Sequence, residues 1–554
     1  MVSTLEEDIP SIDDIINKYP PRALPSGAVV SRFGPSPTGF MHIGGLYVSL
    51  IVQLITKQTK GVFFLRIEDT DSKREVEGAT ELIHKSLAHF GIKLTEGLPH
   101  QEGSYGPYIQ SERKKIYQCF AYHLVSQGLA YPCFMDDEQV KEIRRIQKIR
   151  KAPIGIYGDY SIWRNADSRL VGASVAKNEP YTIRYRAKAS NTKRTLWNDL
   201  LKGPMNLPNH SIDIPLIKSD GMPTYHFAHV IDDYLMGTTH VFRGDEWLNS
   251  TPLHLELFNS LRLTPPVYAH IAPINKLDVD GNKRKLSKRK DPEASVSYFI
   301  DKGYPTIPVM EYLLSLANSS FEVWRKNNLD KDITDYQISI KGLAKSSGPL
   351  FDEQKLQYFS SEYISRMQAS EIYHSVSDFY DSDIGKFAQD LRKQPEKWIE
   401  IFNIERMGPK PRKDLKVWSE FEDKFHYFLA DMQDVDPIEL ASPLCIEMIS
   451  KIIAVELKKL ERNHKAYFSD KDTWFKSIKT TNQQIGLAGS SKEFNNNKDI
   501  YPGSIVHYTQ ALRFALTGEV KTPDLYSIMK TLGNKICRKR LTAFLKSISE
   551  FTTD

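Results

Sequence analysis

One short segment of the chain carries residue types that are suited to binding a phosphate. It reads RFGPSPTGFMHIGG over residues 32–45, so that His42 is followed by Gly44 and Gly45. Glycines let the backbone approach a ligand closely, and the amides at the start of a helix attract anions. His42, directly before the expected helix, could donate a hydrogen bond to a phosphate. A structural histidine after a proline-rich turn explains this segment equally well when it is taken alone.

A second segment, about 240 positions downstream, concentrates positive charge. Residues 283–290 read KRKLSKRK, with six cations in eight positions. A solvated loop is the usual interpretation of such a run. Here it follows an apolar, strand-like run and a glycine turn, so we expect a mobile loop from which Lys285 and Lys288 reach a triphosphate. Nucleotidyl transfer needs this charge, because the β- and γ-phosphate oxygens become more negative as the α-phosphorus is attacked.

The elements around the first segment are predicted by its hydrophobic pattern. Residues 28–33 form a short strand, a helix runs from about Gly45 to Ile55, and residues 62–67 form a second apolar strand. Together they make a β-loop-α-β unit of the kind that opens a doubly wound nucleotide-binding sheet. The first domain is therefore predicted to be α/β, with the glycine-rich loop at the carboxyl edge of the sheet.

The rest of the chain changes character twice. Residues 108–195 show helical patterns rich in Lys and Glu, which indicates an inserted domain. Strand-like runs return at 181–187 and 212–217, and helical patterns dominate from about residue 308 onward. The polar stretch at 490–498 is predicted to be a loop.

Length and composition exclude several classes of protein. The 554 residues predict about three to four domains, too many for a single binding module. Net charge is only +5, and 40% of the residues are hydrophobic, as in ordinary globular proteins. No run approaches about 18 apolar residues and the N-terminus is acidic, so we expect a cytoplasmic enzyme without a membrane span or targeting peptide. The four cysteines match neither a disulfide framework nor a zinc pair, and no metal site and no zinc are predicted.

A basic, amphipathic stretch lies near the C-terminus. Seven basic residues and one acidic residue fall between Lys521 and Lys546, among apolar residues at helical spacing. The pattern predicts a helix pair interrupted at Gly533. A solvated helix face is the default interpretation, and nucleic-acid binding becomes preferable only if another part of the chain calls for it. The tentative RNA contacts are Lys535, Arg538 and Arg540.

Several of these motifs resemble those of bacterial-type glutamyl-tRNA synthetases, which are class I aminoacyl-tRNA synthetases. MHIG and KLSKR are similar to the two ATP-binding motifs of the class, and RFGPSPTG is similar to the glutamyl branch. Gly45 replaces a second histidine, a variation that the glutamyl branch tolerates. The resemblance extends from about residue 28 to 545. Its segments are MHIG at 41–44, KLSKR at 285–289, RFGPSPTG at 32–39, FLRIEDTD at 64–71, PTYHFAHVIDD at 223–233, GTTHVFRGDEW at 237–247, ALTG at 515–518 and TPDL at 522–525.

The resemblance implies a fold and a division into domains. It implies an α/β catalytic domain, with a Rossmann-like parallel sheet and an inserted connective domain, followed by all-α stem-contact and anticodon-binding domains. The expected parts are an N-terminal arm at 1–27, the first catalytic half at 28–107, the inserted connective and acceptor-binding domain at 108–210, the second catalytic half with the KLSKR loop at 211–300, the stem-contact domain at 301–404 and the anticodon-binding domain at 405–554.

The resemblance also implies a reaction. Glutamate attacks the α-phosphate of ATP to give glutamyl-adenylate and pyrophosphate, and the 3′ end of tRNA(Glu) then takes the glutamyl group. The expected ligands are ATP, L-glutamate and tRNA(Glu), with Mg²⁺ bound mainly through ATP and no membrane partner. A monomer is expected. Charging of tRNA(Gln) as well depends on a few side chains around the anticodon.

Residue roles follow from the same resemblance. The catalytic residues would be His42, Lys285 and Lys288. The ATP site would comprise His42, Gly44, Gly45, Glu246, Trp247, Lys285, Ser287 and Lys288. The glutamate site would comprise Arg32, Ser36, Glu68, Tyr225 and Arg243. A guanidinium has only donors, so it pairs with a carboxylate and offers nothing to an amide NH₂, and glutamine should be rejected. Structural ion pairs are the alternative for both arginines.

Three other functions are weighed against this one. A glutaminyl-tRNA synthetase shares the class but usually carries a β-barrel anticodon domain, whereas this C-terminus is helical. A tRNA-modifying paralogue would lack the C-terminal domains. A non-catalytic RNA-binding descendant would have lost phosphate-handling residues, yet His42 and Lys288 are both present.

Overall fold

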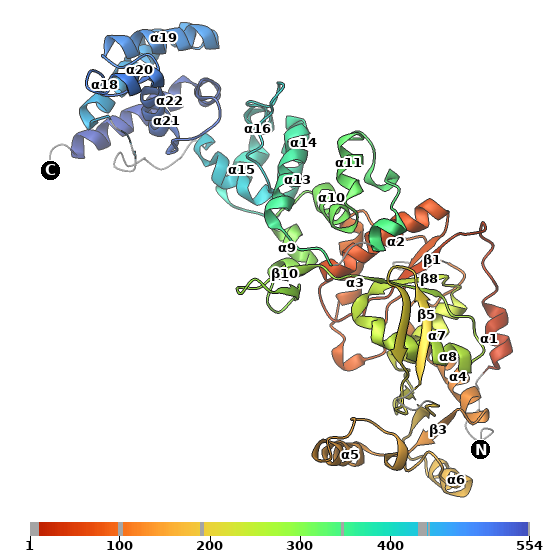
Figure 1. Cartoon of the computed structure of the whole chain (residues 1–554). Helices are drawn as coiled ribbons and strands as arrows, with labels where there is room; N and C mark the ends of the chain where they lie inside the picture. Colours follow the sequence, from red (N-terminus) through yellow and green to blue (C-terminus); the bar gives the residue numbers. More distant parts are fainter. Residues whose placement is uncertain are drawn as a thin grey trace. The chain divides into compact units, whose positions relative to one another are not determined.

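The computed structural model describes residues 10–97, 103–188, 193–344, 348–429, 440, 442 and 444–551. Most of the acidic run expected to form the N-terminal arm lies outside these ranges. The chain separates into two compact units, one of residues 1–301 and 306–356 and the other of residues 302–305 and 357–554 (Figure 1). The finer six-part division stays a prediction.

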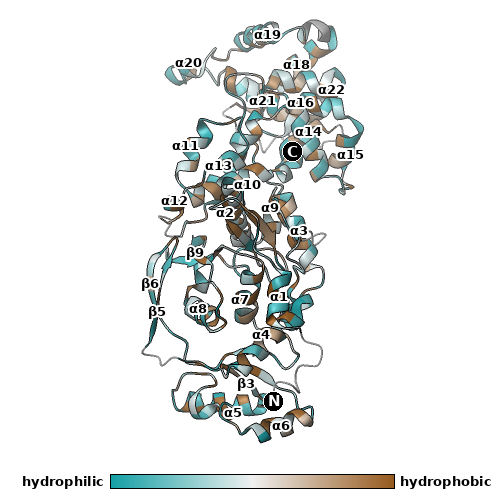
Figure 2. Ribbon diagram, turned by 90° about the vertical axis from the view of Figure 1, so that its right-hand side faces the viewer, coloured by the Kyte–Doolittle hydropathy of each residue, from teal (hydrophilic) through white to brown (hydrophobic). Residues whose placement is uncertain are grey.

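The first unit contains the predicted β-loop-α-β arrangement. Strands β1 (Val30–Phe33) and β2 (Val62–Leu65) pair in parallel and are joined by α2 (Ile43–Thr59), which is longer than expected. Residues on all sides of α2 are buried, and its brown colour in Figure 2 reflects this apolar character. A helix that is apolar all round must be covered by other elements, and α10 (Thr306–Ala317) is one of its neighbours.

A second parallel pair of strands lies beside the first. Strands β8 (His240–Gly244) and β9 (Val267–Ile271) pair in parallel. The backbone N–H of Thr239 donates to the carbonyl of Val30 at 3.0 Å, which places β8 beside β1. The helices α7 (Tyr225–Leu235) and α8 (Thr251–Ser260) precede and follow β8. Sequence segments about 200 residues apart are therefore neighbours in one α/β layer.

The inserted region combines small antiparallel sheets with helices. Strands β3 (Ala130–Cys133), β4 (Thr182–Tyr185) and β7 (Pro215–Ile217) form one sheet, which confirms the two strand-like runs predicted here. Strands β5 (Arg194–Asp199) and β6 (Gly203–Pro208) form a hairpin. The helices are α4 (Lys114–Ser126), α5 (Asp137–Ile149) and α6 (Ser168–Ala176).

The basic segment differs from the mobile loop that was expected. Strands β10 (Asn275–Leu277) and β11 (Lys283–Lys285) pair as an antiparallel hairpin, so its first three cations lie in a strand. The other helices that begin in the first unit are α1 (Ile12–Lys18), α3 (Ala79–His89), α9 (Val296–Asp301), α11 (Ser320–Lys326), α12 (Ile340–Ala344) and α13 (Glu353–Arg366), the last of which crosses the division at Leu356.

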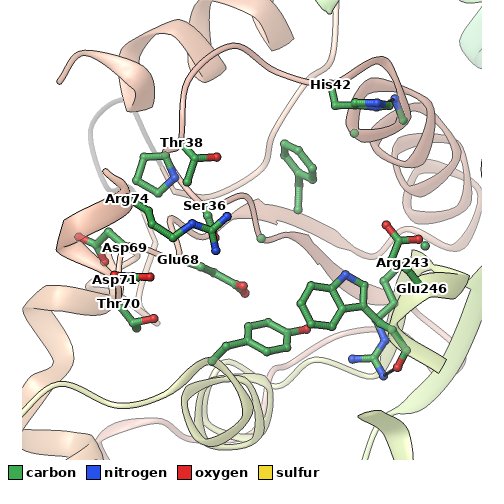
Figure 3. Close-up of a pocket in the computed structure, with 18 of the residues that line it drawn as sticks. Ser36, Thr38, His42, Glu68, Asp69, Thr70, Asp71, Arg74, Arg243 and Glu246 are labelled. Carbon is green, nitrogen blue, oxygen red and sulfur yellow. Dashed lines mark hydrogen bonds between the residues drawn. The ribbon is translucent and has the colours of Figure 1, made fainter. Parts of the chain in front are cut away.

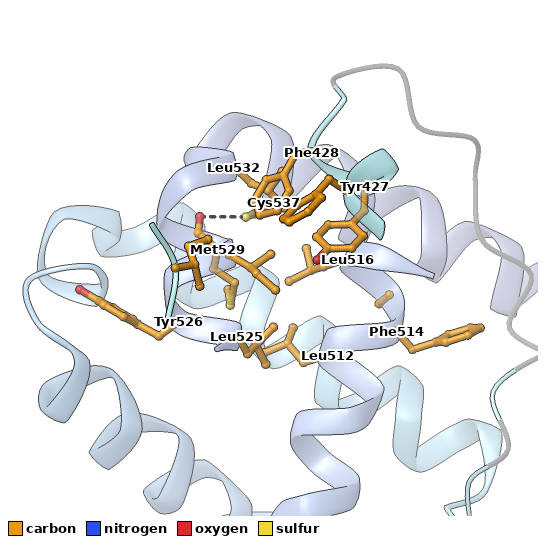
Figure 4. Close-up of a cluster of buried hydrophobic side chains, with 14 of the residues drawn as sticks. Tyr427, Phe428, Leu512, Phe514, Leu516, Leu525, Tyr526, Met529, Leu532 and Cys537 are labelled. Atoms are coloured by element: carbon orange, nitrogen blue, oxygen red, sulfur yellow. Dashed lines mark hydrogen bonds between the residues drawn. The ribbon is translucent and has the colours of Figure 1, made fainter. Parts of the chain in front are cut away.

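Helices are the only regular elements among the described residues of the second unit. Its helices are α14 (Ala369–Phe379), α15 (Lys386–Lys393), α16 (Pro395–Phe402), α17 (Phe421–Phe425), α18 (Ile446–Tyr467), α19 (Lys471–Gln484), α20 (Ser491–Asn496), α21 (Ile505–Thr517) and α22 (Leu525–Phe551). Side chains from α21 and α22 share a buried core with Tyr427 and Phe428 (Figure 4). None of the helices in the described ranges is both long and apolar enough to cross a bilayer.

Two predictions for this unit have opposite outcomes. The helix pair interrupted at Gly533 is confirmed, because that glycine breaks α22 with φ 75° and ψ 164°. The loop predicted at 490–498 is wrong, because α20 forms there. Ser490 caps α20 by accepting the N–H of Glu493 at 3.1 Å, and the Glu493 carboxylate accepts the N–H of Gly489 at 2.8 Å. Local capping thus stabilises a helix that has little apolar surface.

Arg540 does not lie among the exposed cations where it was expected. Only 8% of the residue is exposed, and its guanidinium donates to the carbonyls of Tyr427 (2.6 Å), Leu516 (2.6 Å) and Leu429 (2.7 Å). Burial lowers its pKa to about 10. Arg540 therefore joins three segments of the helical core, and it is withdrawn from the candidate RNA contacts.

Replacing Arg540 with Met should destabilise the second unit by about 2–4 kcal/mol, because three buried carbonyls lose a charged donor. Urea unfolding of the full chain, followed by circular dichroism, measures the change. Arg538→Met is the matched control, since Arg538 is exposed and bonds only Glu461 at 3.4 Å among the described residues. Equal stability of the two variants would contradict the structural role of Arg540.

Candidate functional site

A cavity of about 1120 Å³ opens at the carboxyl ends of the parallel strands. We call it the central cavity. In Figure 3 its labelled residues surround one hollow, with Asp69, Thr70 and Asp71 on one side and His42 and Arg243 on the other. The predicted site residues that line it are Arg32, Ser36, His42, Gly44, Gly45, Glu68, Tyr225, Arg243, Glu246, Trp247 and Lys285.

His42 is the N-cap residue of α2. Its Nδ1 accepts the backbone N–H of Gly44 at 2.9 Å, and the ring also has a hydrogen bond with the backbone of Leu286 in the basic segment. Burial is the largest cause of a lowered His42 pKa, and the charges of Lys288 and Lys285 lower it further. The imidazole is therefore neutral near pH 7, and it lies at a helix N-terminus, where anions are favoured.

The second basic segment lies beside this histidine. Lys285 Nζ donates to Glu246 Oε1 at 2.7 Å, and both residues line the central cavity. Lys288 Nζ donates to the backbone carbonyl of Phe40, three residues after Pro37 in the first motif. Neither Ser287 nor Lys288 is among the residues that line the cavity. The two motifs, distant in sequence, are thus joined around His42, with Lys285 nearest to the hollow.

The carboxylate of Asp291 holds the basic segment in place. Its carboxylate accepts two bonds from the Arg284 guanidinium, at 2.6 and 2.7 Å, and the N–H of Ser287 at 2.9 Å. The bond from Arg284 is the main reason that the pKa of Asp291 is lowered to about 2. A bidentate arginine pair has a defined geometry, so Asp291 limits the positions that Lys285 and Lys288 can take.

The floor of the central cavity rests on a fully buried guanidinium. Arg66, at the end of β2, donates to Glu68 Oε1 at 2.9 Å and to Asp233 Oδ1 at 2.7 Å, and its Nε lies 3.8 Å from Asp232 Oδ2. Asp232 also accepts the Nε of Arg113 at 2.8 Å. Removing one member would leave buried charges unpaired, so this network holds the end of β2 against α7.

Arg32 and Glu68 both belong to this buried network. Arg32 Nε bonds Asp233 Oδ1 at 3.0 Å and its NH2 lies 3.3 Å from His229 Nδ1, which leaves NH1 without a hydrogen-bond partner among the described residues. Burial raises the pKa of Glu68, although the nearby Arg66 opposes this. A Cβ added at Gly34 would lie 2.4 Å from Glu68 Oε1, which explains the glycine at this position.

Arg243, at the end of β8, has a different environment. It is 6% exposed, and no carboxylate of the described residues lies within ion-pair distance of it. Its guanidinium is instead held by neutral groups, among them His270 Nε2 at 3.0 Å and Thr251 Oγ1 at 2.9 Å. An arginine that lines a cavity without a counter-ion favours an anionic ligand.

Aromatic side chains complete the wall near Arg243. The rings of Tyr225 and Trp247 are 4.4 Å apart between centroids, and Trp247 is 37% exposed. Burial raises the pKa of Tyr225, so the phenol stays protonated and can donate a hydrogen bond. Ser36 is exposed at the cavity rim.

Several residues of this site were not singled out from the sequence. Asp233 holds Arg32, and Asp199 bonds the histidine that holds Arg243. The adjacent acids Asp232 and Asp233 were a signal, because they interrupt a helix that is otherwise apolar where it is buried. No comparable signal marks Asp199, which lies in the inserted region.

Comparisons with known proteins agree with one another. Residues 28–357 match the catalytic-domain model of the class I tRNA synthetases (E and Q), and residues 386–545 match an anticodon binding domain. The glutamate–tRNA ligase of Clostridium perfringens (strain SM101 / Type A) is 42% identical over 535 residues, which cover 95% of this chain and 96% of that protein. That of Sorangium cellulosum is 38% identical over 565 residues, with coverage of 95% and 96%. A crystal structure of a glutamate tRNA ligase from Elizabethkingia meningosepticum, in complex with its amino acid, superposes with a TM-score of 0.74 at 25% identity, covering 94% of this chain and 99% of that one.

Replacing Asp291 with Asn should loosen the basic segment, because the amide cannot accept both Arg284 bonds and the Ser287 N–H as the carboxylate does. Hydrogen exchange followed by mass spectrometry should show faster exchange at residues 283–291 and no change in α7. Asp280→Asn, at the exposed turn of the same hairpin, is the matched control. Unchanged exchange at 283–291 would mean that Asp291 does not anchor the segment.

Proposed function

The chain belongs to the class I tRNA synthetases of the E and Q group, and on that premise we propose that it acts as a glutamate–tRNA ligase. It activates glutamate with ATP to glutamyl-adenylate and transfers the glutamyl group to the 3′ end of tRNA(Glu). The observation that carries this proposal is the central cavity, which is lined both by the N-terminus of α2 and by an arginine without a counter-ion. A cytoplasmic monomer fits this role in translation.

The triphosphate lies beside His42. The positive N-terminal end of α2 attracts its phosphate oxygens, and Lys285 and Lys288 neutralise the departing pyrophosphate. The N–H groups of Gly44 and Gly45 already donate to His42, to its Nδ1 at 2.9 Å and to its carbonyl at 2.8 Å, so they bind phosphate only by giving up these bonds. Lys285 exchanges its bond to Glu246 for one to the phosphates when ATP enters. Glu246 and Trp247 lie beside the adenosine, and the hydroxyl of Ser287 adds a donor. Lys288 reaches the nucleotide only by leaving the Phe40 carbonyl.

The residues of this site fit a magnesium ion that is bound as a complex with ATP. The carboxylate closest to the phosphate-binding residues, Glu246, already pairs with Lys285. Mg²⁺ would therefore be held mainly by the ATP itself and would supply positive charge to the phosphates. No covalent enzyme intermediate is needed, because the glutamate carboxylate is itself the nucleophile. The described residues act by positioning the reactants and stabilising charge.

Glutamate lies at the Arg243 end of the cavity. Arg243 and the free NH1 of Arg32 pair with its carboxylates, Tyr225 and Ser36 donate hydroxyls, and Glu68 accepts the ammonium group. Arg243 gains the stronger new pair, since Arg32 already bonds Asp233. Glutamine is rejected because its NH₂ would face the donors of a guanidinium and would leave them unpaired.

The second unit supplies contacts to the tRNA. Lys535 and Arg538 are exposed on the C-terminal part of α22, within the segment that matches the anticodon binding domain. They are the remaining candidates after Arg540 is withdrawn. Such cations bind phosphates and give the complex its salt dependence.

Charging assays test the function directly. The full chain is incubated with ATP, Mg²⁺, labelled glutamate and purified tRNA(Glu), and acid-precipitable label is counted. Charging of tRNA(Glu) with glutamate, and not with glutamine, is expected. Absence of charging, together with absence of pyrophosphate exchange with and without tRNA, would favour a non-catalytic RNA-binding protein. The same assay with tRNA(Gln) measures the breadth of tRNA recognition.

Replacing Arg243 with Gln should raise KM for glutamate by roughly 10- to 100-fold, which corresponds to a charge-assisted pair of about 1.5–3 kcal/mol. KM for ATP should change by less than about twofold, because none of the residues assigned to the triphosphate, His42, Lys285 and Lys288, bonds Arg243. Arg262→Gln, at an exposed position after α8, is the matched control. Equal increases in both KM values would show that Arg243 is only structural.

Replacing both Lys535 and Arg538 with Glu should weaken tRNA(Glu) binding and leave KM for ATP unchanged. The log-log salt slope of tRNA binding should also become shallower by about 1.4–1.8, at about 0.7–0.9 for each lost phosphate contact. Lys492 and Lys498, exposed on or beside α20, receive the same charge change as a control. Unchanged affinity and slope would identify the cations of α22 as a solvated helix face.

A further inference from the structure

Four hydrogen-bonding groups and the ring of Tyr268, 4.8 Å from Cζ to its centroid, hold the Arg243 guanidinium, and each of them is uncharged. Its Nε donates to His270 Nε2 at 3.0 Å, and its NH1 lies 3.3 Å from His254 Nδ1. Its NH2 donates to Thr251 Oγ1 at 2.9 Å and to the carbonyl of Trp247 at 3.3 Å. These acceptors fix the orientation of the guanidinium but do not neutralise its positive charge, which remains available to an anionic ligand.

We propose that His270 and Asp199 are positioning residues for Arg243, acting as a relay in which Asp199 orients His270 and His270 orients the guanidinium. Neither residue touches the substrate. The inference rests on the proposed function, since it assigns Arg243 to a carboxylate of glutamate.

The relay depends on which nitrogen of His270 carries the proton. Asp199 Oδ2 lies 2.5 Å from His270 Nδ1, and a carboxylate can only accept, so Nδ1 carries the hydrogen. His270 Nε2 is then an acceptor and receives the Nε–H of Arg243. The other tautomer would place two N–H groups face to face. Burial lowers the pKa of His270, which also disfavours a second cation beside Arg243.

Asp199 is itself held in one orientation. Besides His270 Nδ1, its Oδ1 accepts the backbone N–H groups of Leu201 at 3.0 Å, Lys202 at 3.0 Å and His270 at 3.2 Å. Both oxygens therefore face donors. An amide in place of this carboxylate would turn its NH₂ either toward these N–H groups or toward His270. In the latter case His270 would adopt the tautomer that repels Arg243.

Loss of the relay should raise KM for glutamate and leave KM for ATP unchanged. Without an acceptor at His270, the Nε of Arg243 loses its bond and the buried guanidinium turns toward the remaining acceptors. The one N–H of Arg243 NH1 that these bonds leave for the glutamate carboxylate is then misplaced, and small misplacements of a charged pair are costly. The phosphate-binding residues His42 and Lys285 do not touch the relay, so their geometry is unaffected.

The experiment compares four variants of the full chain in tRNA(Glu) charging, with KM for glutamate, KM for ATP and Tm measured for each. His270→Met removes the acceptor at similar volume and should raise KM for glutamate about tenfold or more. His270→Gln keeps an acceptor near the Nε2 position and should stay within about threefold of the unmodified chain. Asp199→Asn should raise KM for glutamate to a similar extent as His270→Met. His240→Gln, at the other end of β8, is the matched control.

The outcomes separate the relay from a purely structural role. Rescue by Gln, with KM for ATP unchanged, supports the relay. The relay would be overturned if His270→Met and His270→Gln raised KM for glutamate equally. It would also be overturned if a variant raised KM for glutamate and KM for ATP by the same factor. If the Met variant does not fold, Asp199→Asn is compared with His270→Gln, and equal KM values for glutamate would overturn the relay. No charging by the unmodified chain would overturn the proposed function itself, which is a different result.

Discussion

The central cavity depends on one buried cation. Arg66 has no exposed surface, and it joins Glu68 to the paired acids Asp232 and Asp233. Asp233 in turn holds Arg32. The same charge therefore fixes the carboxylate that faces the cavity and one of the two arginines there. Because buried charges are stable only as a complete set, the end of β2 and the helix α7 must form together, and the site has one geometry.

Local pattern was enough to predict the elements that carry the motifs. The strand before His42, the helix after it and the break at Gly533 all follow from hydrophobic periodicity and glycine placement, and the structure has each of them. The capped helix α20 was missed because its stability comes from two side-chain bonds rather than an apolar face. Arg540 was misplaced because helical spacing does not tell an exposed cation from one that bonds buried carbonyls.

The two cavity arginines could not be distinguished from sequence. Both follow strand-like runs, yet Arg32 lies beside Asp233 and Arg243 lies among histidines. The difference arises from α7, α8 and β9, which bring residues from distant segments to each guanidinium. Charge neutralisation is a property of the folded environment. The ion pair with Asp233 makes Arg32 part of the scaffold, whereas the absence of such a pair among the described residues leaves Arg243 available to a substrate.

The hairpin of β5 and β6 has a consequence for how the inserted region can be exchanged. Asp199 ends β5, and the N–H of the next residue, Leu200, donates to the carbonyl of Tyr268 in β9 at 2.8 Å. The end of the insertion is thus bonded directly to a strand of the catalytic domain. The inserted region therefore cannot be exchanged as a separate module. A graft that replaces everything up to the end of β6 would keep the cavity arginines but exchange Asp199, which bonds the histidine that holds Arg243. Recombination between relatives would have to leave the hairpin of β5 and β6 with the catalytic domain that it supports.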